Sequence, residues 1–275
     1  MIDWVTNKTV TKIIKKVKEK LQSMLPLSVI ITTFNEEEHI EAVLKSVEWA
    51  DEILLVDSFS TDDTVTLAKK YHPKIFQRKY ISPADQKNWA IPQATHDWIL
   101  ILDADERVTP KLREEITSLL RVPPPKDAYW IPRQSFFMGK KVRFSGWQGD
   151  QVIRLIKKEK CRYQDVQVHE EIETAGIIVG KLKNKLHHFT YKNRDHFLAK
   201  MLRYAEWSAK DHFEKTPRVT FVHLYVKPFF RFVKHYVIQL GFLDGEVGFA
   251  ISKIMAWGVY QRYLKIKELR KQDKR

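Results

Sequence analysis

The stretch WILILDADERVTP, at positions 98–110, places two carboxylates one residue apart directly after an apolar run. Asp103 and Asp105 are therefore expected at the end of a buried strand, where acidic side chains need a partner. Mg²⁺ and Mn²⁺ prefer oxygen ligands and leave positions open for phosphate oxygens. The sequence predicts a metal-bound diphosphate as that partner, in which the ion offsets the charge of a departing diphosphate. The alternative is a cluster that caps the following helix, in which Glu106 would take part.

Two earlier apolar runs end in polar side chains in the same way. LSVIITTF (27–34) contains Thr33 near its end, and the apolar part of EILLVDS (52–58) is followed by Asp57 and Ser58. A helical pattern follows each run, and strand and helix keep alternating, so residues 26–120 are predicted to form a parallel sheet covered by helices. Ligands bind beyond the carboxyl ends of such strands. We therefore expect Thr33, Asp57, Asp103 and Asp105 to converge on one crevice.

The later part of the chain has a different pattern of apolar and polar residues. Residues 128–190 contain apolar runs separated by turns, which is typical of mixed or antiparallel strands. From about 194 the chain is predicted to be helical, with aromatic and aliphatic residues interleaved with Lys and Arg. We find no internal repeat and no low-complexity tract beyond the lysine-rich ends.

Composition limits the classes of protein that remain. Cys161 is the only cysteine, which excludes a disulfide framework and fits a reducing compartment. No apolar run is long enough to predict a signal peptide or a transmembrane helix. The net charge of +14 is concentrated in residues 1–25 and 192–275, while residues 26–191 are neutral. Nucleic acid and anionic lipid are the usual partners of such basic ends.

The motifs together resemble a known family. LSVIITTFNEEEHIEAVLKSV, EILLVDSFSTDDTVTLAKKY and QKNWAIPQATHDWILILDADERVTPKL are similar to family 2 glycosyltransferases of the GT-A fold. Within that family they resemble bacterial enzymes that add a β-1,4-linked glucose to the inner core of lipopolysaccharide. The resemblance implies an α/β, Rossmann-like domain with a mixed sheet at 26–190, after a basic segment at 1–25. A basic amphipathic helical region would follow at 191–275.

The resemblance also implies an inverting reaction with a UDP-sugar donor and a divalent metal, Mg²⁺ or Mn²⁺. Asp57 would accept from uracil, Lys87 would meet a phosphate, Asp103 would contact ribose or sugar, and Asp105 would be the main metal ligand. The full set that it implies for the nucleotide sugar is Thr33, Asn35, Glu36, Asp57, Ser58, Asp62, Gln86, Lys87, Asn88, Asp103, Ala104, Asp105 and Trp147. Simpler roles remain open for some of these: helix-end charge for Glu36, capping for Asp62, and a solvated helix face for residues 86–88.

Inversion needs a base that removes the proton of the acceptor hydroxyl. The family places an Asp before an Arg-Leu pair, and WQGDQVIRL offers Asp150, with Glu170 as its rival. His169 resembles a late metal or diphosphate ligand, or is simply packed. Trp147 would stack on a sugar, or is an ordinary half-buried aromatic residue.

The basic ends predict the acceptor and the location. A lipid-linked saccharide would be glycosylated at an anionic membrane surface, which predicts a peripheral protein at the inner face of the cytoplasmic membrane and no nucleic acid partner. Two other classes of protein fit parts of the sequence. A sugar nucleotidyltransferase would need a glycine-rich phosphate loop, which ITTFNEEEH lacks. A basic nucleic-acid-binding protein would leave the strand-end carboxylates unexplained.

Overall fold

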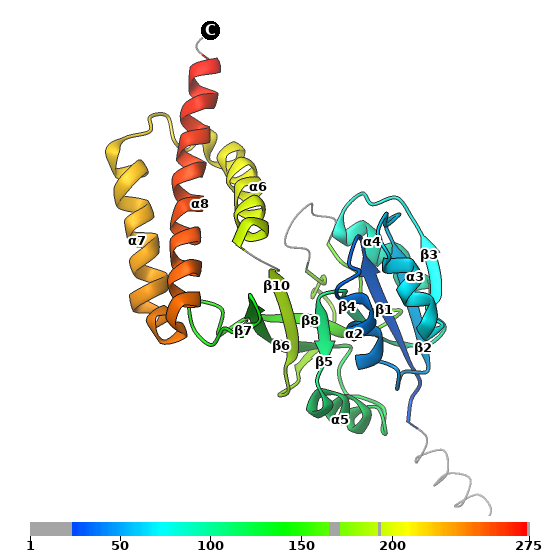
Figure 1. Cartoon of the computed structure of the whole chain (residues 1–275). Helices are drawn as coiled ribbons and strands as arrows, with labels where there is room; N and C mark the ends of the chain where they lie inside the picture. The colour runs from blue at the N-terminus through cyan, green and yellow to red at the C-terminus, as the bar shows by residue number, and fades with distance from the viewer. Residues whose placement is uncertain (1–23, 165–170, 192–193, 274–275) are drawn as a thin grey trace, which may run out of the picture. The chain divides into compact units, whose positions relative to one another are not determined.

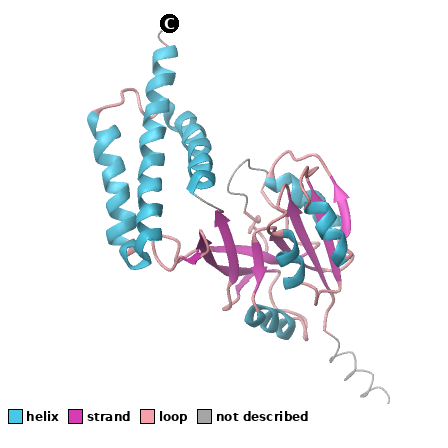
Figure 2. Cartoon of the chain, viewed as in Figure 1, coloured by secondary structure: helices cyan, strands magenta, loops and turns pink. Residues whose placement is uncertain are grey.

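The computed structural model describes residues 24–164, 171–191 and 194–273, except the side chain of His196 (Figures 1 and 2). The chain divides into two compact units. Unit 1 comprises Met1–Arg133 and Gln151–His187, and unit 2 comprises Gln134–Asp150 and His188–Arg275. Residues 134–150 thus group with the C-terminal helices, although the sequence assigned them to the domain at 26–190.

Unit 1 is built on four parallel strands in the order β3-β2-β1-β4, as the alternating pattern predicts. Antiparallel β8 continues the sheet beside β4, and β6 pairs antiparallel with β8. The path then runs to β10 and β5, while β7 and β9 pair with β6. The strands are β1 Leu27–Thr33, β2 Glu52–Asp57, β3 Lys74–Gln77, β4 Trp98–Asp103, β5 Glu106–Val108, β6 Ala128–Phe137, β7 Lys140–Lys141, β8 Gln151–Lys157, β9 Val179–Lys181 and β10 Leu186–Tyr191.

At β1, β2 and β4 both faces of the parallel sheet are buried, which explains why these strands are apolar at nearly every position, whereas the edge strand β3 is partly exposed. On β1, Val29 and Ile31 join one hydrophobic cluster, with residues of α2 (Ile40–Ser46) and α5 (Pro110–Leu119). Ile30 joins the cluster on the opposite face, with Ala84 and Ala90 of α4 (Pro83–Ala90). The helix α3 (Thr64–Ala68) follows β2.

Unit 2 contains three main helices, of which α8 packs against both others (Figure 1). They are α6 Arg194–Phe213, α7 Lys227–Val233 and α8 Gly245–Gln272. Segments of π-helix, Val222–Val226 and Lys234–Ile238, flank α7, and a short 3₁₀ turn, Gly241–Asp244, leads into α8. Among the helices of the described residues, none has both the length and the apolar character needed to cross a bilayer.

Candidate active site

The strand ends of unit 1 bring the predicted residues into one row. The parallel register aligns Thr33 with Asp57, Thr32 with Asp103, and Asp57 with Gln77. The expected convergence at the carboxyl edge of the sheet is therefore correct for these positions.

Asp57 is fully buried in this row and is held from within the chain. Its carboxylate accepts the backbone N–H of Ser60 at 3.0 Å and the side-chain amide of Gln77 at 3.1 Å. The next residue, Ser58, donates its N–H to the carbonyl of Thr33 at 2.9 Å, so the strand end and its loop are fixed together.

The loops after β1 and β2 are joined by reciprocal hydrogen bonds. Asn35, at a positive φ of 54°, donates its N–H to the Ser60 hydroxyl and accepts from the N–H of Thr61, both at 2.8 Å. Asp62 accepts the N–H of Thr64 at 3.0 Å and that of Glu37 at 3.2 Å. Burial raises the pKa of Asp62, but these bonds outweigh it and hold the pKa below its usual value. Asp62 therefore joins the two loops, while the N-cap position of α3 is Asp63.

The Glu36 N–H donates to the Thr64 hydroxyl at 2.8 Å, so its backbone also joins the two loops. Thr33 differs from these residues. Its hydroxyl is buried and has no hydrogen-bond partner within the described residues. Because a buried hydroxyl normally has a partner, this atom is a candidate contact for a ligand at the strand ends.

Helix α4 contributes its buried face rather than a solvated one. Gln86 and Lys87 are only 1% and 2% exposed. The Gln86 amide donates to the Ser58 hydroxyl at 3.2 Å and accepts from Arg78 at 3.0 Å. The solvated-face alternative is therefore wrong for these two residues.

Asn88 forms two hydrogen bonds with the backbone of Tyr163. Its amide oxygen accepts the backbone N–H of Tyr163 at 2.8 Å, and its amide nitrogen donates to the Tyr163 carbonyl at 2.9 Å. These bonds place the Tyr163 ring near the ammonium group of Lys87, 5.3 Å from nitrogen to ring centroid. Asn88 therefore positions Tyr163, and its place at the donor site stays a prediction.

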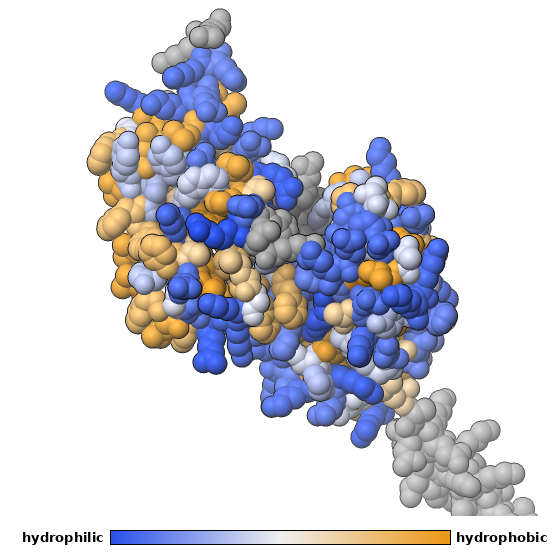
Figure 3. All heavy atoms as spheres, viewed as in Figure 1, coloured by the Kyte–Doolittle hydropathy of each residue, from blue (hydrophilic) through white to orange (hydrophobic). Residues whose placement is uncertain are grey.

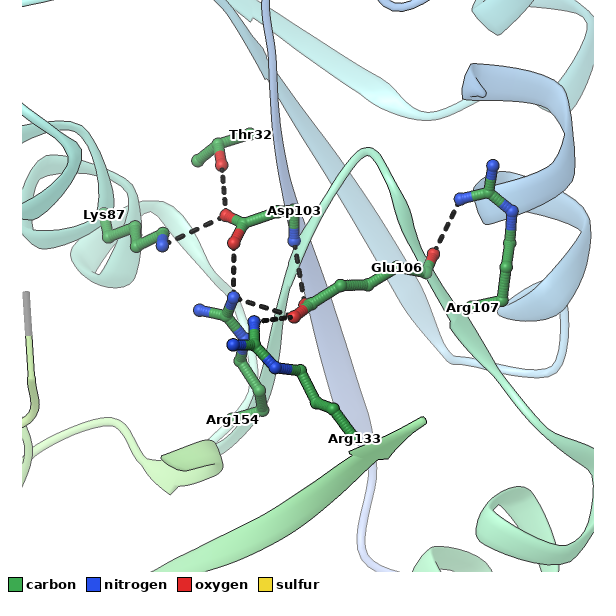
Figure 4. A network of polar contacts seen from close by, with 7 residues as sticks. All are labelled: Thr32, Lys87, Asp103, Glu106, Arg107, Arg133 and Arg154. Atoms are coloured by element: carbon green, nitrogen blue, oxygen red, sulfur yellow. Dashed lines mark hydrogen bonds and ion pairs between the residues drawn. The ribbon is translucent and has the colours of Figure 1, made fainter. Parts of the chain in front are cut away.

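Asp103 has partners within the protein, and the metal-bound diphosphate that the sequence indicates as a partner stays a prediction. Lys87 Nζ lies 3.0 Å from Asp103 Oδ1, and the Thr32 hydroxyl donates to the same oxygen at 3.2 Å (Figure 4). The guanidinium of Arg154 forms an ion pair with Oδ2. Burial raises the pKa of Asp103, but Arg154 and Lys87 outweigh it and hold the pKa far below its usual range. The carboxylate is therefore ionised at neutral pH.

Glu106 completes this network and is fully buried. It accepts from Arg154 at 3.0 Å, from Arg133 at 3.2 Å and from the backbone N–H of Asp103 at 3.2 Å (Figure 4). The residue that caps α5 is instead Thr109, whose hydroxyl accepts the N–H of Leu112 at 3.2 Å. The expectation that Glu106 is a capping residue is wrong, because its carboxylate forms ion pairs with Arg133 and Arg154 instead.

Arg107 holds the turn that carries Asp105. Its guanidinium donates to the carbonyl of Ala104 at 2.6 Å and to that of Glu106 at 2.8 Å. Burial lowers the pKa of Arg107 to about 10, although Asp105 and other carboxylates act in the opposite direction. Arg107 therefore stays protonated at neutral pH. Ala104 is buried, so its contribution to a site is its backbone.

The donor set at this edge fits a metal held chiefly by Asp105. Both oxygens of Asp103 already accept from donors of the protein. Asp105 is half-buried in the turn between β4 and β5. In the part of the chain that the structure describes, no three His, Cys, Asp or Glu side chains are grouped to hold a metal ion. Mg²⁺ often takes only one or two carboxylates and completes its shell with phosphate oxygens and water. The set fits that arrangement.

The remaining predicted residues belong to unit 2 or fall outside the described residues. Trp147 and Asp150 belong to unit 2, where Trp147 packs against Tyr191 and Phe197, as its half-buried alternative allowed. The Asp150 N–H donates to the Trp147 carbonyl at 3.3 Å, and β8 begins at the next residue. His169 and Glu170 lie outside the described residues.

Comparison with known proteins identifies the family. The model of glycosyl transferase family 2 matches residues 28–233. The chain belongs to this family. Its α/β mixed sheet with a C-terminal helical region is the predicted GT-A fold class. As an enzyme of glycosyl transfer, it is neither of the other two classes that the sequence left open.

This family 2 glycosyltransferase has relatives over nearly its whole length. It is 29% identical to the lipopolysaccharide core biosynthesis glycosyltransferase LpsC of Rhizobium meliloti, over 87% of this chain and 93% of LpsC. It is 27% identical to the glycosyltransferase RT0209 of Rickettsia typhi, over 90% of this chain and 88% of that protein. A crystal structure of Staphylococcus aureus TarS 1–349 in complex with UDP matches 90% of this chain and 92% of its own, with 16% identity and a TM-score of 0.46.

Proposed function

We propose that this glycosyltransferase moves a sugar, glucose in the first instance, from a UDP-sugar to a hydroxyl of a lipid-linked saccharide such as the lipopolysaccharide core. One observation carries the proposal. The ends of three adjacent parallel strands align Thr33, Asp57 and Asp103 in a row, above the buried cations Lys87 and Arg154. This edge is where α/β sheets bind nucleotides.

The cations of this network favour a diphosphate. Lys87, Arg133 and Arg154 are buried or nearly buried beside the carboxylates of Asp103 and Glu106. Cations in a site of low dielectric attract an anion. The joined loops after β1 and β2 would hold the nucleoside, with Asp57 as the acceptor for uracil.

A divalent metal fits beside this network at Asp105. When bound, it would stabilise the negative charge that develops on the leaving diphosphate. Lys87 would orient the carboxylate of Asp103 toward the donor, and Arg107 would keep the turn of Asp105 in place. These roles need no further protein ligand, and a contribution from His169 remains a prediction.

The acceptor hydroxyl needs a base because its proton must leave as the oxygen attacks the anomeric carbon and UDP departs. We assign this role to Asp150, which directly precedes β8. β8 runs antiparallel to β4, so its first residue lies toward the edge at which β4 ends. Glu170 is the alternative base.

The donor assignment is tested by calorimetric titration of UDP, GDP and CMP with Mn²⁺ and then with EDTA. Binding of UDP that disappears with EDTA is the expected result. No binding of any nucleotide under either condition would refute the donor site. Binding that survives EDTA would instead assign the diphosphate to the cations alone.

The lipid-linked acceptor is supported by the similarity to LpsC and by the basic ends of the chain. Transfer of radiolabelled sugar from UDP-glucose to truncated lipopolysaccharide core is the direct assay, with UDP-galactose and UDP-N-acetylglucosamine as competing donors. If another UDP-sugar gives the product, the assigned sugar changes and the proposed type of reaction stays the same. Nucleotide binding without transfer to any saccharide would refute the acceptor class.

A further inference from the structure

A continuous apolar surface covers one side of the α7 region in unit 2 (Figure 3). We call it the aromatic face. Its large side chains are all more than a third exposed: Phe221, Val222, Tyr225, Val226, Phe229, Phe230, Val237, Ile238, Leu240, Phe242, Leu243 and Phe249. So many exposed side chains on a few consecutive turns form a patch rather than the scattered exposure of an ordinary surface.

The spacing of these residues shows that the aromatic face extends along the whole helical segment 221–238. Phe221, Tyr225 and Phe229 follow one another at intervals of four, so they share one side of the helix. The opposite side faces the protein, as the burial of His235 and the ion–aromatic contact of Lys227 with Tyr263 show. Residues 221–238 are helical throughout, so the exposed stripe runs along one side of a single helical segment. A stripe of this kind suits a flat surface.

The aromatic face is held in shape by its own ring contacts. Phe232 stacks on Tyr236 at 5.2 Å between centroids, and both rings meet Phe249 of α8 edge-on at 5.7 Å. Tyr236 also meets Phe242 at 6.4 Å. The patch is thus ordered before any partner binds, which lowers the entropic cost of binding.

Charge indicates which partner fits. Residues 215–249 contain five Lys and Arg and two acidic residues, Asp244 and Glu246. Asp244 accepts the backbone N–H groups of Arg143 and Phe144, both at 2.9 Å, and is therefore directed inward. Glu246 lies 3.7 Å from the ammonium group of Lys140, which offsets its charge. A second copy of the chain would bring like charges together at this face, whereas an anionic lipid surface would complement it.

We propose that the aromatic face docks flat on an anionic lipid bilayer, with its rings in the headgroup region and Lys234 among the lipid phosphates. Aromatic and aliphatic residues on one side of a helix with Lys and Arg beside them are the composition of interfacial helices. The proposal concerns unit 2 alone and does not depend on the donor or the acceptor proposed above.

The test is sedimentation of the full chain with vesicles of phosphatidylcholine, with and without phosphatidylglycerol. The wild-type chain should bind the phosphatidylglycerol vesicles and lose most of that binding in high salt. Phe229→Ser with Phe230→Ser should weaken binding by about tenfold or more, because two exposed rings no longer enter the interface. Val122→Ser with Ile178→Ser removes apolar residues of similar exposure from unit 1 and should bind as the wild type does.

Charge is tested separately. Lys234→Glu should weaken binding to the anionic vesicles severalfold, and Lys160→Glu, an exposed lysine of unit 1, should change it little. UDP binding by each variant is measured in parallel, so loss of the lipid site and loss of the nucleotide site are distinguished. Equal binding by the wild type and the double Phe variant would overturn the proposal. So would a dimer in lipid-free solution that the double Phe variant abolishes.

Discussion

Substitution of Asp103 by Asn tests the central network, since it keeps the shape of the side chain and removes its charge. Asp103 pairs with Lys87 and Arg154, whose side chains are 2% and 5% exposed. Removing one partner of a buried ion pair typically costs about 3–5 kcal/mol, because the other charge stays out of water. Asp103 itself is 35% exposed, and Glu106 still faces Arg154, so we expect about 3 kcal/mol.

The measurement is urea unfolding followed by circular dichroism, with hydrogen exchange of the β1 and β4 amides to assign the loss to unit 1. The matched control is Asp97→Asn, an exposed carboxylate just before β4, which should change the free energy of unfolding by less than about 0.5 kcal/mol. If Asp103→Asn is as stable as this control, the carboxylate does not balance the buried cations. The charge argument for a diphosphate site would then lose its basis.

Three further substitutions separate binding, turnover and stability. Asp105→Asn should leave the free energy of unfolding within about 1 kcal/mol of wild type and abolish the Mn²⁺-dependent part of UDP binding in calorimetry; unchanged binding would move the metal elsewhere. Asp150→Asn should keep UDP binding and lower turnover at least about 100-fold, as loss of a general base does. Retained turnover would transfer that role to Glu170. Glu52, far from the strand ends, has its pKa lowered to about 2: burial raises it, but Lys74 and three further hydrogen bonds outweigh that effect. The contribution of ionised Glu52 to the free energy of unfolding is complete above the unfolded pKa of 4.5 and is lost as the pH falls toward 2. Glu52→Gln should therefore lower the free energy of unfolding by about 3 kcal/mol at pH 7 and by little at pH 2. UDP binding should not change.

The parallel core could be predicted because its information is local. Each of β1, β2 and β4 is an apolar run that ends at a polar residue, and a helical pattern follows β1 and β2. The position of Asp57 and Asp103 at one edge then follows from the parallel arrangement. The capping of α5 by Thr109 is also a local feature. From the sequence, this capping was assigned to the nearby Glu106 instead.

The partners of these acids could not be predicted, because they come from distant strands. Arg133 lies on β6 and Arg154 on β8, and no spacing in the sequence links either arginine to Glu106. The bond between Asn88 and Tyr163 spans 75 residues in the same way. One clue was available: Glu106 lies three residues after the end of the buried strand β4, and a buried acid requires a cation. Charged residues within the apolar runs of β6 and β8 were the candidates.

The sequence separation in this network has a consequence for the order in which the protein is made. Arg154 follows Asp103 by 51 residues, so at about 5–20 residues per second the ribosome delivers it roughly 3–10 s later. During that interval Lys87 is already available to Asp103, but Arg154, which pairs with both Asp103 and Glu106, has not yet emerged. We expect the nascent sheet to keep this edge hydrated until β8 arrives. The last strand to join beside β4 would then also be the one that completes the nucleotide edge.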